Sequence, residues 1–122
     1  MENSFYRLVE QIKTEAEKAL SRLSFLERAV FWVFMPLKIN VDTDKGVASL
    51  VILKDGTIQL REYLSPDADN TIQADFETLT DLYQSRDKNQ FIQAETEGRI
   101  KIISHNRKGQ QAEGKLRELL SS

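Results

Sequence analysis

Apolar residues at the start of the chain recur at steps of three and four. They are Phe5, Leu8, Val9, Ile12, Ala16, Ala19, Leu20 and Leu23. This period places them on one face of a helix, while Glu10, Lys13 and Lys18 fall on the opposite face. The pattern predicts an N-terminal amphipathic helix over residues 1–23.

A second helix is predicted from about Phe25 to Phe34. The run Ser24-Phe25-Leu26-Glu27 is a capping-box pattern, in which the serine accepts a free backbone N–H and the glutamate reaches back to the cap residue. Pro36 has no backbone N–H and disfavours a helical conformation at the residue before it. The helix should therefore end near Met35.

The period then changes from 3.6 to 2, which is typical of strands. Four strands are predicted, over Leu37–Val41, Val47–Leu53, Ile58–Leu64 and Thr71–Asp75. The turn between the second and third contains Asp55-Gly56, a pair that suits a tight hairpin. We expect these four strands to form a meander, in which each strand pairs with the next.

The remaining segment alternates helix and strand. The helices are predicted over Phe76–Ser85, Asn89–Glu97 and Gly109–Leu120, and a fifth strand over Arg99–Ser104. Asp75 is the expected N-cap of the first helix, and Gly98 supplies the left-handed end of the second. Because the fifth strand follows a helical crossover, we expect it to pair in parallel with one neighbour. The order predicts an α+β fold, in which helices cover one face of a five-stranded, mostly antiparallel sheet.

Composition narrows the class of protein. The 122 residues suit a single domain over 1–122. The 17 Lys and Arg and 19 Asp and Glu give a net charge of −2 without a basic stripe, so nucleic acid is not an expected partner. The longest apolar run, Ala29–Leu37, is far shorter than the about 20 residues that span a bilayer. The N-terminus lacks a signal-peptide pattern, and a cytoplasmic protein is expected.

Little in the sequence suggests catalysis. There is no cysteine and His105 is the only histidine, so neither a transition-metal site nor acid–base chemistry is expected. Asp42-x-Asp44 and Asp67-x-Asp69 lack the glycine and glutamate of a calcium loop and are interpreted as turns. No phosphate-binding loop or nucleophile elbow occurs. We therefore expect no catalytic residue, metal or cofactor.

The densest apolar run is Phe31-Trp32-Val33-Phe34-Met35, and one helix face cannot bury all five side chains. They are either core and dimer contacts or the adaptable wall of an apolar pocket. Further apolar side chains lie on the elements expected to cover the sheet. The candidate ligand-binding residues are Phe31, Trp32, Phe34, Met35, Phe76, Leu79, Leu82, Tyr83, Phe91, Ile92, Leu116, Leu119 and Leu120.

The segment Gly98-Arg99-Ile100-Lys101-Ile102 resembles the Gly-Lys-Ile-Lys-Ile strand of the sterol-carrier-protein domain family. Ala74-Asp75 is similar to that family's strand-to-helix step, and Gly46 with the following strand is similar to its early hairpin. A helix containing Lys115-Leu116 follows at a matching distance. The resemblance covers about Val33–Leu120. The chain departs from it at Ser104 and His105, and it lacks a glycine in Gln84–Gln90, where the first crossover helix usually ends.

The resemblance implies that a fatty acid, acyl-CoA or sterol-like lipid is held in a tunnel between sheet and helices, close to the C-terminal helix. The first hypothesis is therefore non-catalytic binding or carriage of an apolar ligand. The second is a homodimerisation or protein-interaction module that uses the Phe31–Met35 run and the N-terminal helix. An enzyme subunit or regulatory fragment is the third, and nothing in the sequence gives it an active site.

Overall fold

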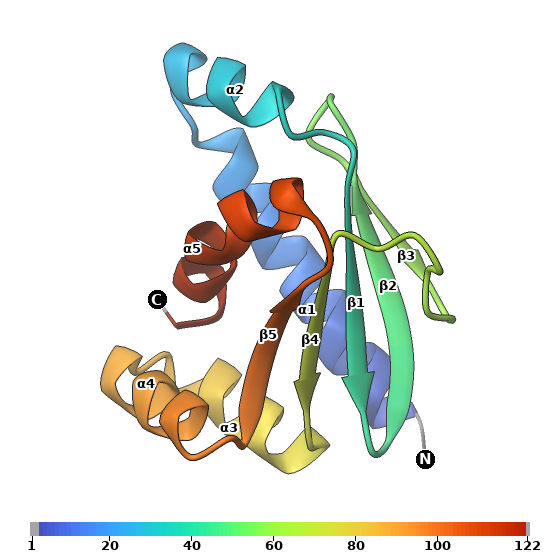
Figure 1. The fold of residues 1–122 in the computed structure, drawn as a ribbon, viewed down its shortest axis with the longest axis vertical. Coiled ribbons are helices and arrows are strands. Elements are labelled where there is room, and N and C mark those ends of the chain that lie inside the picture. Colours follow the sequence, from blue (N-terminus) through green and yellow to red (C-terminus); the bar gives the residue numbers. More distant parts are fainter. Residues whose placement is uncertain (1–2, 122) are drawn as a thin grey trace.

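A computed structural model describes residues 3–121, which form five helices and five strands (Figure 1). The helices are α1 (Asn3–Ser21), α2 (Phe25–Trp32), α3 (Phe76–Ser85), α4 (Lys88–Thr96) and α5 (Arg107–Ser121). The strands are β1 (Leu37–Thr43), β2 (Gly46–Ile52), β3 (Ile58–Arg61), β4 (Asn70–Ala74) and β5 (Ile100–Ser104). Most predicted bounds agree within two residues. The start of the predicted first helix, residues 1 and 2, lies outside the described residues.

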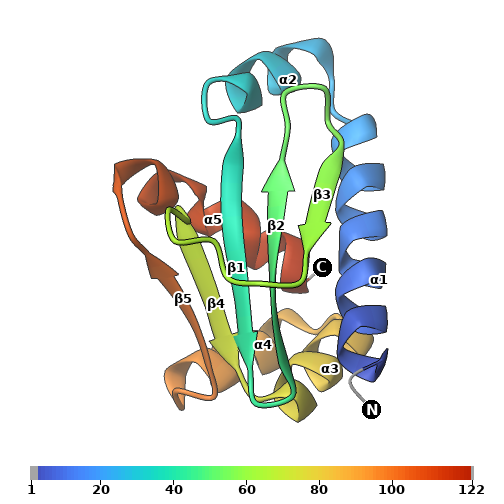
Figure 2. The same cartoon turned by 90° about the vertical axis from the view of Figure 1, so that its right-hand side faces the viewer.

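The strands form one sheet in the order β3-β2-β1-β4-β5. The β1–β4 pair is parallel, and the other three pairs are antiparallel. Helices α1, α3, α4 and α5 lie on the same side of this sheet, and α2 lies at one end of it (Figures 1 and 2). The predicted α+β class and the mostly antiparallel sheet covered on one face are confirmed.

Two predictions about strand pairing are wrong. The four early strands do not form a meander, and β5 pairs antiparallel with β4. The reason lies after β3, which ends at Arg61 instead of Leu64. The chain then crosses the uncovered face of the sheet, in front of β2 and β1, before it enters β4 (Figure 2). This crossover places β4 beside β1 with the same direction.

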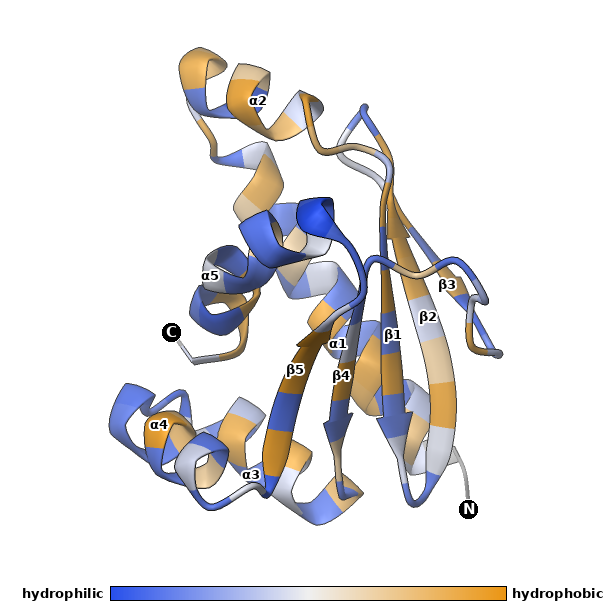
Figure 3. Ribbon diagram, in the orientation of Figure 1, coloured by the Kyte–Doolittle hydropathy of each residue, from blue (hydrophilic) through white to orange (hydrophobic). Residues whose placement is uncertain are grey.

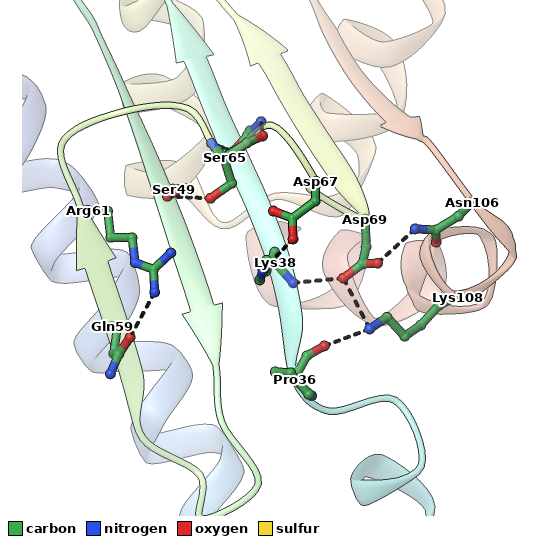
Figure 4. Close-up of polar contacts among 11 residues, drawn as sticks. Pro36, Lys38, Ser49, Gln59, Arg61, Ser65, Asp67, Asp69, Asn106 and Lys108 are labelled. Carbon is green, nitrogen blue, oxygen red and sulfur yellow. Dashed lines mark hydrogen bonds and ion pairs between the residues drawn. The ribbon is translucent and has the colours of Figure 1, made fainter.

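Side-chain hydrogen bonds hold the crossover against the sheet. The side chain of Asn40 accepts from the backbone N–H of Ser65 at 2.8 Å and donates to its carbonyl at 3.0 Å. The Ser65 hydroxyl donates to that of Ser49 at 3.1 Å (Figure 4). All three residues are buried. Because buried polar groups are costly when unpaired, these bonds fix the path of the crossover.

The core lies between the sheet and the helices. Alternate side chains of the strands point into it, among them Leu37, Ile39, Val41, Ala48, Leu50, Ile52, Ile58, Ile72, Ala74 and Ile100. The predicted stripe of α1 packs on them through its first half, with Phe5, Leu8, Val9, Ile12 and Ala16 buried. Helix and sheet approach closely at Gly46, where a Cβ atom would lie 2.6 Å from the Phe5 ring.

The helix ends follow the predicted capping residues in three places. Ser24 and Glu27 form the capping box of α2. Asp75 caps α3, and its carboxylate accepts from the backbone N–H of Thr78 at 3.0 Å. Gly98 follows α4 with φ of 78°. The predicted end of α2 at Phe34 is wrong: the helix ends at Trp32, because the chain must turn to enter β1 at Leu37.

A buried carboxylate, that of Asp69, holds the start of α5 against the sheet (Figure 4). Asp69 is 5% exposed. Its carboxylate accepts from the backbone N–H of Lys38 at 2.9 Å and from the side chain of Asn106 at 2.8 Å, and it pairs with Lys108 at 3.4 Å. Asn106 in turn accepts from the backbone N–H of Gly109 at 2.7 Å. One side chain therefore joins β1, the entry to β4 and the first turn of α5.

Gly109 allows α5 to approach β4 at this point. A Cβ atom there would lie 2.1 Å from the carbonyl oxygen of Asp69. The carbonyl of Gly109 also accepts from the side chain of buried Asn70 at 2.9 Å. The first turn of α5 can keep this position only while residue 109 has no side chain.

We expect Gly109→Ala to destabilise the fold by about 2 kcal/mol, because α5 must move away from Asp69. Gly114, in the same helix, is the matched control, since a Cβ atom there meets nothing within 4 Å. Gly114→Ala should stabilise by up to about 1 kcal/mol through helix propensity. Urea unfolding of both variants measures the difference, and an equal effect at the two positions would contradict the close approach.

The cap of α3 predicts a pH dependence. Hydrogen bonds from Thr78 hold the pKa of Asp75 below its usual value. A carboxyl whose pKa is lower in the folded state contributes stability above its unfolded pKa, near 4, and loses it as the pH falls through the folded pKa. Asp75→Ala should cost about 1 kcal/mol at pH 7, as the loss of a cap does. Urea unfolding should show this gap shrinking as the pH is lowered below about 4. A gap that is constant with pH would argue against the capping role.

Candidate ligand-binding cleft

An apolar hollow of about 660 Å³ lies between α1, α2 and α5. We call it the main cleft. From α1 and the turn after it, the cleft is lined by Glu15, Ala16, Ala19, Leu20, Arg22 and Leu23, and from the α2 region by Glu27, Val30, Phe31 and Phe34. Leu37 and Ile52 line it from the sheet, Arg86 from the end of α3, and Gln111, Ala112, Lys115, Leu116, Glu118 and Leu119 from α5.

Small side chains make room for this hollow. Ala16, at the end of the buried half of α1, and Ala19, one turn further on, both line the cleft. Ala112 faces it from α5. Alanine in place of a larger apolar residue leaves space that neighbouring side chains fill only in part. The two helices therefore enclose an apolar space above the sheet, where longer side chains would have filled it.

Helix α2 bounds the cleft and packs against the core through Phe31, which is partly buried. No residue of α2 is buried. Phe25 and Leu26 are 78% and 76% exposed, and Val30 is 62% exposed. Figure 3 shows α2 as a largely apolar helix at the end of the molecule, beyond the main body of the sheet. The capping box, rather than burial, is the local interaction that supports this helix.

A second hollow, of about 350 Å³, lies on the other side of Phe31. It is bounded by α1, α2 and the turn between β2 and β3, with Trp32 and Met35 in its wall. Leu20, Leu23, Phe31 and Ile52 line both hollows. These four shared residues show that the two hollows adjoin each other beneath α2.

The charged groups around the main cleft are balanced and largely engaged. Arg86 pairs with Glu15 at 3.8 Å, and Lys115 pairs with Glu118 at 3.3 Å. The carboxylate of Glu27 accepts from the backbone N–H of Ser24 at 2.9 Å. This hydrogen bond lowers the pKa of Glu27, and the Lys115 charge lowers it further. The rim is therefore charged without a dominant sign.

An ion-pair network fixes the outer side of α5. Arg117 donates to both carboxylate oxygens of Glu95 on α4, at 2.7–3.1 Å, and to Glu113 at 3.2 Å. The hydrogen bonds that Arg117 donates to Glu95 raise the pKa of Arg117. The Ser104 hydroxyl of β5 donates to Glu113. Because α5 forms one wall of the main cleft, these contacts help to fix the position of that wall.

The structure brings together six of the thirteen predicted ligand-binding residues. Phe31, Phe34, Leu116 and Leu119 line the main cleft. Trp32 and Met35 line the second hollow. Their role in binding stays a prediction.

The other seven predicted residues line neither hollow. The core contains Leu79, Leu82, Phe91 and Leu120, each no more than 5% exposed. Phe76 packs against Phe5 with ring centroids 6.5 Å apart, and Tyr83 lies under Arg86. Ile92 is 51% exposed. The apolar space thus lies beside α1 and α2, rather than between α3 and α5.

Sequence reasoning did not select the α1 wall of the cleft. The periodic pattern places four of these residues on the apolar face of the first helix and indicates nothing more about them: Ala16, Ala19, Leu20 and Leu23. The sequence does contain a signal for this wall. The apolar stripe of the first helix extends seven residues beyond Ala16, and it contains two alanines three positions apart. Such a stretch on a helix with a filled core beneath its first half is typical of a wall facing open space.

Within residues 3–121, no group of three or more His, Asp or Glu side chains could hold a metal ion. None of the helices described is both long and apolar enough to cross a bilayer. His105 and Thr71 lie at the uncovered face, where the imidazole Nε2 and the hydroxyl are 2.7 Å apart.

No protein-family model and no curated protein match the sequence. Solved structures match the fold. A UbiJ-SCP2 ubiquinone synthesis protein superposes with a TM-score of 0.58 over 91% of this chain and 88% of its own, at 19% identity. Sterol carrier protein 2 like 2 from Aedes aegypti gives a TM-score of 0.53 over 93% of this chain and 97% of its own, at 18% identity.

The fold also occurs as part of a larger protein. The stereoselective inverting sec-alkylsulfatase Pisa1 from Pseudomonas sp. matches with a TM-score of 0.50 and 23% identity. The match covers 70% of this chain and 13% of the sulfatase. The resemblance seen in the Gly98–Ile102 segment is thus confirmed at the level of the fold. The chain therefore has the fold of the sterol carrier protein 2 (SCP2-type) structures.

Proposed function

We propose that this protein binds or carries an apolar, lipid-like ligand in the main cleft, without catalysing a reaction on it. The observation that carries the proposal is the apolar space of about 660 Å³ between α1, α2 and α5. Binding sites for small molecules are typically about 300–1,000 Å³ and mostly apolar, with a few polar groups at the edge. The main cleft has both the size and this distribution of residues.

Burial of the ligand supplies the driving force. Each methylene group that leaves water contributes about 0.8 kcal/mol. The walls that receive it are aliphatic and aromatic side chains, chiefly Leu20, Leu23, Phe31 and Leu116. A fatty acid, an acyl-CoA and a sterol-like molecule each have such an apolar part, and the proposal covers this class.

The matching structures support the same class of function. One of them is named as a sterol carrier protein and another as a ubiquinone synthesis protein. The absence of catalysis is part of the proposal. It is supported by the cleft rim, where Glu15, Glu27 and Lys115 each already contact another protein group.

A large side chain introduced into the main cleft should strongly weaken binding of the ligand. We expect Ala19→Trp, on the cleft side of α1, to weaken binding of a fluorescent fatty acid at least tenfold, because the indole occupies the space of the ligand. Thr14→Trp is the matched control, since Thr14 is exposed on α1 and lines neither hollow. Fluorescence titration of the three proteins and native mass spectrometry provide the measurement. Equal affinity in all three proteins, or no binding by the wild type, would sink the proposal.

The exposed face of α2 favours a second candidate, a homodimerisation module. Phe25, Leu26 and Val33 are each more than 75% exposed, and association of two chains would cover them. Under the ligand-binding proposal, sedimentation at low protein concentration should show a monomer that retains bound lipid. An obligate dimer with empty or filled-in clefts, which Leu26→Glu converts to monomers, would favour the second candidate.

A further inference from the structure

Arg86 has a backbone conformation that is rare for a side chain of its size. It follows α3 with φ of 51° and ψ of 36°, in the left-handed region. It is the sole residue other than glycine with positive φ in the range 3–121. This conformation costs an arginine free energy that glycine or asparagine largely avoids. Contacts of the Arg86 side chain must therefore offset the strain.

Those contacts join three helices. The guanidinium donates to the carbonyl oxygen of Leu119 on α5 at 2.8 Å, and it pairs with Glu15 of α1 at 3.8 Å. It also lies over the ring of Tyr83 of α3, 4.8 Å from the centroid. The planar group is thus held from three sides, and the Arg86 side chain is only 30% exposed.

This cluster lies at one end of the main cleft. Along α1, the lining begins at Glu15, and it continues past the end of the helix to Leu23, next to α2. From Glu15 to Leu20 the rise of an α-helix gives a length of about 8 Å. Along α5, the lining ends at Leu119. Arg86 contacts Glu15 and Leu119, the two residues that mark the end remote from α2.

We infer that Arg86 determines ligand specificity by closing the main cleft at the end remote from α2, so that it limits the length of apolar chain the cleft accepts. The inference rests on the proposed function, because it concerns the same cleft. At that end, the Arg86 side chain spans from α1 to α5. Removal of the side chain would open the cleft toward α3.

A purely structural role for Arg86 predicts a different result. An arginine that only caps α5 would change stability when replaced, but it would leave the preferred ligand length unchanged. An arginine that binds a ligand carboxylate would, when replaced, weaken binding of every chain length by the same factor. Replacement of Arg86 changes the dependence of affinity on chain length only if Arg86 closes the end of the main cleft.

The experiment measures competition by saturated fatty acids, from octanoate to stearate, against a bound fluorescent fatty acid. For the wild type, affinity should rise about fourfold with each added methylene until the cleft is filled, and then stay constant. Arg86→Asn suits the left-handed backbone and removes the long side chain. In this variant the rise should continue to longer acids, with a gain of at least about fourfold for the longest.

Two further variants serve as controls. Arg86→Lys keeps most of the side-chain length and should keep the wild-type limit. Arg99→Asn removes an exposed arginine that pairs with Glu97 and lines neither hollow, so its chain-length profile should equal that of the wild type. Arg86→Gly, which accepts the backbone conformation without strain, replaces Arg86→Asn if the latter fails to fold.

The outcomes separate the inference from the proposed function. If the wild type binds no fatty acid, both are overturned. If the wild type shows a length limit that Arg86→Asn and Arg86→Gly leave in place, the inference alone is overturned and the proposed function stands. A uniform loss of affinity at all lengths assigns Arg86 to the ligand head group and also overturns the inference.

Discussion

The buried carboxylate of Asp69 is the interaction on which the position of α5, and with it the main cleft, depends. It accepts hydrogen bonds from Lys38 of β1 and from Asn106 at the start of α5. A buried carboxylate that lost these partners would carry a large desolvation cost, so the arrangement is strongly favoured. Gly109 lets the helix come close enough to be held. From this fixed first turn, α5 extends across the core and forms one wall of the main cleft.

Much of the fold could be predicted from sequence because local patterns determine it. The stripe from Phe5 to Ala16, the caps at Ser24 and Asp75, and the left-handed Gly98 depend on neighbours within a few residues. The strand pairing could not be predicted in this way. It depends on hydrogen bonds between Asn40 and Ser65, which are 25 positions apart and carry no periodic signal. The sequence around a polar residue in a strand is the same whether its hydrogen-bond partner is a crossing segment or water.

The candidate site, like the strand pairing, could be predicted from the sequence only in part. Periodicity indicates which face of a helix is apolar, but it does not indicate where two apolar faces fail to meet. Leu79 and Leu116 both lie on predicted apolar faces and both are buried in the core, yet only Leu116 also lines the cleft. The small side chains of Ala16 and Ala19 line the same cleft as Leu116, whereas Leu79 lines neither hollow. Such differences follow from packing in three dimensions.

Helix α2 shows why the fold and the site place separate demands on the chain. Eight residues form a helix that is marginal in isolation, and none of them is buried in the core. The capping box at Ser24 and Glu27 supports it locally, while the sheet and α5 are fixed by contacts that do not involve it. The apolar side chains of α2 therefore remain available for another surface. Phe31 already faces two hollows, so a ligand that entered either would bury apolar area that folding alone leaves exposed. The contacts that stabilise the core and the apolar surface that the proposed ligand would cover therefore lie largely in different parts of the chain.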